Sequence, residues 1–445
     1  MLNLKSKWLA LLGGAILTAA PVFAQDSGPL IDILVKKGIV TDQEAEELRA
    51  DLVKDFANNS SAGKLNLSSS LVEFKFSGDL RMRYENNAQV PELATGAAPL
   101  VNETSRQRFR YRFNGDVILQ KGWTAGFALE SGQASDSANQ TFTGAADDYG
   151  VFLARAYVGW QPNANWSFVL GKQKNPFYTT EMRWDADISP QGVYENYKKF
   201  FGAKDTFEIR AMQHAMQDNN EQIAGPSGRD TWMFEQQAVL THWFGPENLN
   251  SAILALGYSA YNQSNMASTA TVTPTNSPSN SAAFAGSVRA QDYATFAGEV
   301  NWANLNGAGT AFKIYWDSSY NTTGGTRAYR VYNLNPSLFS KGATAWLTGI
   351  GYSYGTGKVQ GDYSAKLDYR EIGVTATDPN TNDSDWGLSK VNQKGWKLAL
   401  AYNVTDFTNF NVTYFDTRII QPGMTFSLGN LDRSHELLVD LVVKF

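Results

Sequence analysis

The alternation of apolar and polar residues with a period of two, sustained along most of the chain, limits its fold more than any other feature. In the segment VEFKFSGDLRMRYEN, even positions from Val72 to Tyr84 are mostly apolar and odd positions from Glu73 to Glu85 are mostly charged. Successive side chains of a strand point to opposite faces, so this segment predicts a strand with one apolar and one charged face. In a soluble sandwich the apolar face meets a second sheet. Strands with this many charges favour a transmembrane antiparallel β-barrel with an apolar outside and a water-filled interior.

Applied along the chain, the pattern predicts an all-β fold of about 16 strands, an even number as in bacterial outer-membrane barrels. The segments 192–202 and 250–261 alternate poorly and carry the weakest signals. The predicted strands are 72–86, 108–119, 122–132, 151–161, 165–173, 192–202, 206–216, 232–244, 250–261, 290–302, 310–321, 344–356, 361–371, 393–404, 406–417 and 434–445. We expect the last of them to pair with the first and close the barrel over residues 72–445.

The connections between these strands alternate in length, which supports the strand assignment independently. Short turns are found at 120–122, 162–165, 202–205, 245–248, 355–358 and 404–406. Long polar connections are found at 87–104, 133–150, 174–191, 217–231, 262–289, 322–343, 372–392 and 418–433. Outer-membrane barrels have short periplasmic turns and long external loops. Aromatic residues near the strand ends fit interfacial girdles: Trp123, Trp160, Trp166, Trp243, Trp302, Trp396 and Tyr402.

The first 24 residues are typical of a signal peptide. Lys5 and Lys7 precede the apolar run WLALLGGAILTAA, and Val22 and Ala24 stand at the −3 and −1 positions of a cleavage site. The apolar run is shorter than a full membrane span, which argues against an uncleaved anchor. After Ala24 no apolar stretch approaches the ~20 residues of a transmembrane helix.

A short helical segment is expected between the signal peptide and the barrel, within residues 25–56. Thr41 and Glu44 have the spacing of a capping box. One apolar stripe follows, made of Leu48, Leu52, Val53 and Phe56. Such a helix is marginal alone, so it either packs on a neighbouring copy, the barrel mouth or the cell wall, or remains a solvated leader with partial helicity. Residues 57–71 are predicted to be a polar linker.

Composition excludes several classes of function. A net charge of −5 does not suggest a nucleic-acid partner, and the absence of Cys excludes thiolate metal sites and thiol nucleophiles. The three histidines, His214, His242 and His435, are scattered and none accompanies a GxSxG motif. We therefore expect no catalytic residues, no metal and no cofactor, although some outer-membrane barrels are hydrolases.

Three segments resemble known bacterial outer-membrane proteins. The final strand HELLVDLVVKF ends on Phe445 and is similar to the terminal strand that the barrel-assembly machinery reads. Residues 154–193, including GKQKNPF at 171–177 and WDADISPQG at 184–192, resemble the family known as putative porins, as does the preface KKGIVTDQEAEELRA. The resemblance implies a diffusion channel for small hydrophilic solutes and ions in the outer membrane, assembled as a homotrimer. The alternative is a structural protein that tethers this membrane to the cell wall through residues 29–56.

In the porins that this chain resembles, the third external loop folds inward and narrows the channel. The corresponding segment here is 174–191, and the resemblance makes its charged residues constriction candidates: Lys174, Glu181, Arg183, Asp185 and Asp187. Asp185 and Asp187 also suit a simpler role, because aspartate commonly caps turns without meeting solute.

Six arginines share the predicted inward face of the first two strands: Arg81, Arg83, Arg106, Arg108, Arg110 and Arg112. Inward positions of such barrels are polar, so we expect some of these arginines to line the water path opposite the acids of 174–191. Alternatively, they pair with Glu73, Asp79, Glu85 and Asp116 and fill the wall.

Overall fold

The computed structural model describes residues 35–37, 40–41, 43–49, 68–91, 101–132, 138–217, 231–261, 292–305, 309–322, 342–379, 381–422 and 431–445. The chain divides into two units, Met1–Ser68 and Ser69–Phe445. The predicted signal peptide and residues 57–67 of the predicted linker lie outside the described residues. No helix in the described ranges is long and apolar enough to cross a membrane.

The first unit contains the helical residues 43–49 that the capping box predicts. The backbone N–H of Glu44 donates to Thr41 Oγ1 at 3.3 Å, and the N–H of Thr41 donates to Glu44 Oε2 at 2.9 Å. This reciprocal arrangement satisfies two amides at the start of the helix. Of the predicted apolar stripe, Leu48 is exposed, whereas Leu52, Val53 and Phe56 lie outside the described residues.

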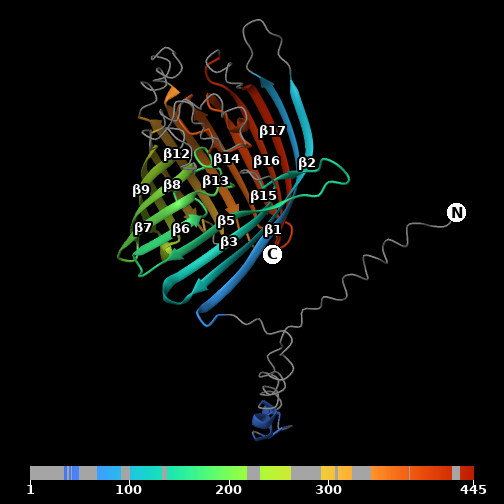
Figure 1. The fold of residues 1–445 in the computed structure, drawn as a ribbon, viewed down its shortest axis with the longest axis vertical. Coiled ribbons are helices and arrows are strands. Elements are labelled where there is room, and N and C mark those ends of the chain that lie inside the picture. The colour runs from blue at the N-terminus through green and yellow to red at the C-terminus, as the bar shows by residue number, and fades with distance from the viewer. Residues whose placement is uncertain are drawn as a thin grey trace, which may run out of the picture. The chain divides into compact units, whose positions relative to one another are not determined.

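The second unit is a closed antiparallel barrel (Figure 1). Its strands are β1 (Leu71–Pro91), β2 (Asn102–Leu119), β3 (Trp123–Ser131), β4 (Gln140–Thr141), β5 (Val151–Trp160), β6 (Trp166–Lys172), β7 (Gln191–Phe201), β8 (Asp205–Gln217), β9 (Thr231–Phe244), β10 (Asn250–Tyr261), β11 (Asp292–Ala303), β12 (Thr310–Asn321), β13 (Thr344–Tyr354), β14 (Tyr363–Ile372), β15 (Gln393–Asn403), β16 (Thr408–Ile419) and β17 (Leu431–Lys444). The short β4 pairs only with β2, and β3 pairs directly with β5. In the described part of the chain the remaining 16 strands form the ring. All the predicted strands are confirmed, including the two with weak alternation.

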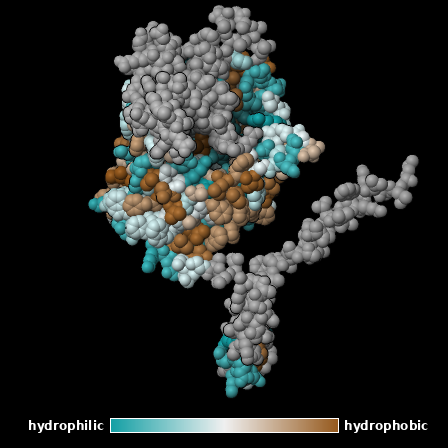
Figure 2. Space-filling view, in the orientation of Figure 1, coloured by the Kyte–Doolittle hydropathy of each residue, from teal (hydrophilic) through white to brown (hydrophobic). Residues whose placement is uncertain are grey.

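The two faces of the wall follow the sequence alternation. On β1, Arg81 and Arg83 are buried inside the barrel, whereas Met82 and Tyr84 are exposed on its outside. Figure 2 shows hydrophobic side chains over much of the visible outer face. This distribution suits a barrel surrounded by lipid, in which the apolar residues face outward.

Aromatic side chains meet across neighbouring strands close to the strand ends. The rings of Trp123 and Trp160, at the start of β3 and the end of β5, stack with their centroids 5.6 Å apart. The Trp396 ring on β15 contacts Tyr369 on β14, with centroids 4.7 Å apart. Both pairs fit the predicted interfacial girdles.

The short turns require positive backbone angles. Between β2 and β3, Lys121 has a φ of 59° and Gly122 a φ of 76°. A Cβ on Gly122 would lie 2.1 Å from the carbonyl oxygen of Gln161, so only glycine fits there. This turn keeps β2 and β3 in register at the end of the barrel where the chain enters and leaves the ring.

The barrel closes between its first and last strands, as expected. β1 pairs with β17 from Asp79 opposite Lys444 to Pro91 opposite Leu431. Within this seam Arg83 stands directly opposite Asp440, and both side chains point into the barrel. The seam therefore adds charged side chains to the interior next to those of β2.

Candidate channel interior

The connection between β6 and β7, residues 173–190, lies inside the barrel; we call it the first inner segment. The Tyr178 hydroxyl donates to Glu299 Oε2 on β11 at 2.8 Å, and Arg183 Nε donates to Asp317 Oδ1 on β12 at 2.8 Å. Glu181 forms an ion pair with Lys397 on β15. Strands β11, β12 and β15 are far around the ring from β6, so this segment reaches across the interior.

The connection between β14 and β15 also lies inside, and we call residues 373–379 and 381–392 the second inner segment. The Ser319 hydroxyl on β12 donates to the Ala376 carbonyl at 2.7 Å. Trp386 is 1% exposed, and the Arg370 guanidinium lies 5.1 Å from the centre of its ring. The sequence predicted only an external loop here. The strongest signal of burial was the tryptophan in this mostly polar stretch, because an indole this large is rarely left in water.

The two inner segments bond to each other. The N–H of Asp185 donates to the Thr381 carbonyl at 2.6 Å, and the Thr381 hydroxyl donates to the Arg183 carbonyl at 2.8 Å. Asp185 Oδ2 accepts the N–H of Ser384 at 3.1 Å, while its Oδ1 accepts the N–H of Asp187 at 2.9 Å. Asp185 therefore caps a turn and also joins the two segments.

Arginines of β1 and β2 stand opposite one another in the sheet, with Arg81 across from Arg110 and Arg83 across from Arg108. Like charges in such positions repel, so the arrangement requires acids between them. Asp79 supplies one, because its carboxylate accepts Arg110 Nη2 at 2.8 Å and Arg112 Nε at 2.7 Å.

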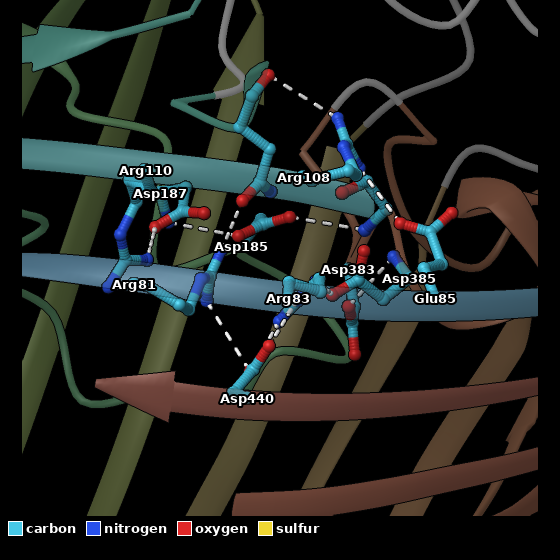
Figure 3. Close-up of polar contacts among 12 residues, drawn as sticks. Arg81, Arg83, Glu85, Arg108, Arg110, Asp185, Asp187, Asp383, Asp385 and Asp440 are labelled. Atoms are coloured by element: carbon cyan, nitrogen blue, oxygen red, sulfur yellow. Dashed lines mark hydrogen bonds and ion pairs between the residues drawn. The ribbon is translucent and has the colours of Figure 1, made fainter. Parts of the chain in front are cut away.

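The first inner segment supplies a second acid to the same arginines. A carboxylate oxygen of Asp187 lies 3.7 Å from Arg110 Nη1 (Figure 3). The same oxygen lies 3.6 Å from Arg112 Nη1. Asp187 of the first inner segment and these arginines of β2 are thus in contact, although Asp79 already shares their charge.

Arg83 is held by two carboxylates from distant parts of the chain. Its Nε donates to Asp440 Oδ1 on β17 at 2.7 Å, and its Nη1 donates to Asp385 Oδ2 of the second inner segment at 3.0 Å (Figure 3). Arg81 lies beside it, with Nη1 3.9 Å from Asp440 Oδ2. Both guanidinium groups are largely buried.

Glu85 neutralises the remaining pair of predicted arginines. It accepts Arg106 Nε at 2.7 Å and Arg108 Nη1 at 3.0 Å. Of the acids proposed as alternative partners, Asp79 and Glu85 do pair with the arginines. Glu73 instead lies 3.2 Å from Lys75, and Asp116 accepts the Tyr157 hydroxyl at 3.0 Å.

Among the predicted residues of the first inner segment, Lys174 alone is exposed and has no ion-pair partner in the described ranges. Burial and the neighbouring Asp383 raise the pKa of Asp185 well above its ordinary value. Burial likewise raises the pKa of Asp383 to about 6, against the effect of the nearby Lys397 ammonium. The same ammonium lowers the pKa of Glu181. Burial would raise the pKa of Asp385, but Arg83 holds it below its usual range.

His214, which the sequence left without a role, packs the first inner segment against the wall. Its ring centre lies 5.9 Å from that of Phe177 and 5.6 Å from that of Trp184, and its Nε2 is 3.3 Å from Glu235 Oε2. His242 and His435 are on the outward face and contact Asp205 and Asp416 instead. The described residues include no group of three or more side chains suited to hold a metal ion.

The family model described as "putative porin" matches residues 37–293 of the chain. The chain belongs to the putative porin family. Such a porin is a channel of the bacterial outer membrane, which agrees with the apolar exterior and charged interior of the barrel. No curated protein sequence matches the chain.

Solved structures similar to this porin include other bacterial channels. OprB of Pseudomonas putida at high pH has 10% sequence identity and a TM-score of 0.48, covering 84% of this chain and 94% of its own. OmpF of Salmonella typhi in complex with daunomycin has 10% identity and a TM-score of 0.46, covering 85% and 99%. The outer membrane channel DcaP of Acinetobacter baumannii has 11% identity and a TM-score of 0.43, covering 85% and 99%.

Proposed function

We propose that solutes crossing this porin pass an opening narrowed jointly by the two inner segments and bounded by the arginines of β1 and β2. The observation that carries the proposal is the position of Asp187. Its carboxylate lies within 3.7 Å of Arg110, while the same segment is bonded at Arg183 to β12 across the interior. A polypeptide that spans the interior in this way leaves less width for water and solutes, and width with fixed charge is what makes a pore selective.

The charges at this opening occur in pairs, so the proposed filter separates solutes mainly by size and by local polarity. Asp79, Asp187 and Asp440 offset much of the arginine charge. We expect small hydrophilic solutes and ions to pass and larger ones to be held back at the level of the inner segments.

Cysteine accessibility tests this arrangement directly, because the native chain contains no Cys. Single variants Asp187→Cys and Lys174→Cys are reconstituted in planar bilayers and treated with a charged methanethiosulfonate reagent. Modification of Asp187→Cys should reduce single-channel conductance, since the added group would occupy the opening. Leu441→Cys, on the outward face of β17, is the matched control and should not respond. An unchanged current through modified Asp187→Cys would overturn the proposed opening, and the absence of any conductance would overturn the channel itself.

We further propose that Phe445 is the signal read by the barrel-assembly machinery and that the porin assembles as a homotrimer. The support is the position of Phe445 directly after the closing strand and the family to which the chain belongs. Deletion of Phe445 should reduce the amount of folded barrel in the outer membrane. Cross-linking of the native membrane followed by electrophoresis should show a trimer, and a monomer alone would contradict the second proposal.

The role of residues 25–56 is tested separately by deletion. If these residues contact the cell wall, a chain lacking them should conduct normally but lose its co-sedimentation with isolated peptidoglycan. Equal co-sedimentation of both chains would contradict a tethering role.

A further inference from the structure

A water-accessible cavity of about 540 Å³ lies inside the barrel, bounded by β1, β2 and the turn ends of β13 to β17. It is far larger than the ~30 Å³ that one water occupies in the liquid, so it can hold an organic solute of several heavy atoms. Polar side chains line it, including Asn403, Asn409 and Asn411. Because the turn ends of β13 to β17 bound it, the cavity lies on the short-turn side of the barrel, away from the long connections.

Basic side chains outnumber acidic ones in the lining of this cavity. Its basic residues are Arg81, Arg110, Arg112, Lys366 and Lys444, and its acidic residues are Asp79, Asp362 and Asp440. The acids are also largely engaged. One oxygen of Asp362 accepts the backbone N–H groups of Thr356, Lys358 and Val359 at 3.0 to 3.1 Å.

The remaining acids are shared with several arginines. Asp79 bonds to both Arg110 and Arg112, and Asp440 is bonded by Arg83, which does not line the cavity. The positive charge facing the cavity is thus only partly compensated by the chain's own carboxylates.

Two cationic groups in this lining are not fully paired with carboxylates of the described residues. Lys366 on β14 is exposed to the cavity, and no carboxylate in the described part of the chain lies within ion-pair distance of its ammonium. Across the cavity, Arg81 also belongs to the lining, and the only acid near its Nη1 in the described ranges is Asp440, whose Oδ2 lies 3.9 Å away. An anion that reached this nitrogen would gain a charge-assisted hydrogen bond.

We propose that this cavity is a binding subsite for small organic carboxylates on their way through the channel, with Lys366 and Arg81 as the contacting cations. We assign the solute to the carboxylates because of the neighbouring arginines. Arg110 and Arg112 already donate hydrogen bonds from their guanidinium groups to the carboxylate of Asp79. A strongly hydrated ammonium such as that of Lys366 adds attraction without fixing orientation. The inference rests on the proposed function, since the solute must reach the cavity through the pore.

The test is block of the potassium chloride current by succinate in single channels. Succinate should reduce the wild-type current in a concentration-dependent manner while it occupies the subsite. Lys366→Gln should raise the half-blocking concentration about tenfold, and Lys366→Arg should stay within about twofold, because it retains the charge. Lys121→Gln removes the same charge from an exposed turn outside the cavity and should behave as the wild type.

A second variant guards against poor folding of Lys366→Gln. Asn411→Asp introduces an acid into the same lining from β16 and should also weaken the block. A channel with normal conductance that succinate does not block, or blocks equally in the wild type and both variants, overturns the inference alone. A reconstituted protein that carries no current overturns the proposed function, and the subsite with it.

Discussion

Gly78 and Phe445 exchange two backbone hydrogen bonds, with the N–H of Gly78 donating to the Phe445 carbonyl at 2.8 Å and the N–H of Phe445 donating to the Gly78 carbonyl at 3.1 Å. The Phe445 ring also covers the α-carbon of Gly78, since a Cβ built there would lie 2.6 Å from two ring atoms. The last residue of the chain is therefore fitted onto the first strand at a position where no side chain fits.

Replacement of Gly78 should weaken closure of the barrel. The added methyl of Gly78→Ala would clash with the Phe445 ring and with the Arg112 carbonyl, 2.3 Å away. Overpacking of this kind costs about 1–3 kcal/mol, so urea unfolding in lipid vesicles should show a loss of that size. Gly351→Ala is the matched control, because its Cβ would have only ordinary contacts, at 3.7 Å or more. Equal loss in the two variants would show that the fit at Gly78 does not matter.

Removal of Asp440 should destabilise the barrel more than removal of an exposed acid. Asp440→Ala leaves the buried Arg83 with Asp385 as its remaining partner. Breaking a buried ion pair costs about 3–5 kcal/mol, whereas an exposed pair contributes about 0–1 kcal/mol. Glu73→Ala, which breaks the exposed contact with Lys75, is the comparison. Denaturant unfolding of the two variants measures the difference, and similar midpoints would contradict the prediction.

Truncation of Trp386 should widen the channel. The buried indole packs against Arg370 and holds the second inner segment to the wall. Trp→Ala changes in packed sites cost about 3–5 kcal/mol, enough to release a segment of this size. Single-channel recordings of Trp386→Ala should show larger and noisier currents than the wild type. Trp386→Phe keeps a ring and should conduct almost normally; a folded Trp386→Ala barrel with wild-type conductance would argue against the role of this segment.

Asp383 should make stability depend on pH in the acidic range. Its pKa is raised to about 6 by burial, so the folded state holds the proton more tightly than the unfolded state. The contribution of Asp383 to the free energy of unfolding should therefore fall as the pH rises from about 4 to about 6, by at most about 3 kcal/mol, and level off above. Glu181 and Asp385, whose pKa values are lowered, act in the opposite sense at pH values below about 4.

Unfolding measured across this range tests the assignment to Asp383. Asp383→Asn should make the decrease between pH 4 and pH 6 smaller, leaving the part that comes from Asp185, whose pKa burial also raises. Asp148→Asn, which changes an exposed acid before β5, should leave the decrease at its full size. A decrease of unchanged size in Asp383→Asn would assign it to another group.

The strands were predictable because one face of each strand meets lipid and the other meets water. Apolar and polar residues therefore alternate along the sequence with a period of two. The conformation of the second inner segment was not predictable in the same way. Its surroundings inside the barrel are polar, so residues such as Asp383 and Asp385 resemble those of an external loop. Trp386 is its one aromatic residue.

The predicted arginine stripe shows the same limit. The inward direction of Arg83 and Arg110 follows from alternation alone and is confirmed. Their partners Asp440 and Asp187 come from the seam and from the first inner segment. A local sequence pattern does not predict ion pairs between residues so far apart. These pairs depend on the conformation that the connections adopt inside the closed barrel.

The contacts of Arg83 also have a consequence for the order of folding. Its two acidic partners lie 357 and 302 residues along the chain, one in the last strand and one in the second inner segment. Contacts between such distant residues form late, because the entropy of closing so long a loop must be overcome first. The ring and the contacts inside it should thus mature in one cooperative step, so that a nascent barrel lacking β17 would leak freely, and the proposed selectivity would begin only after β17 has paired with β1.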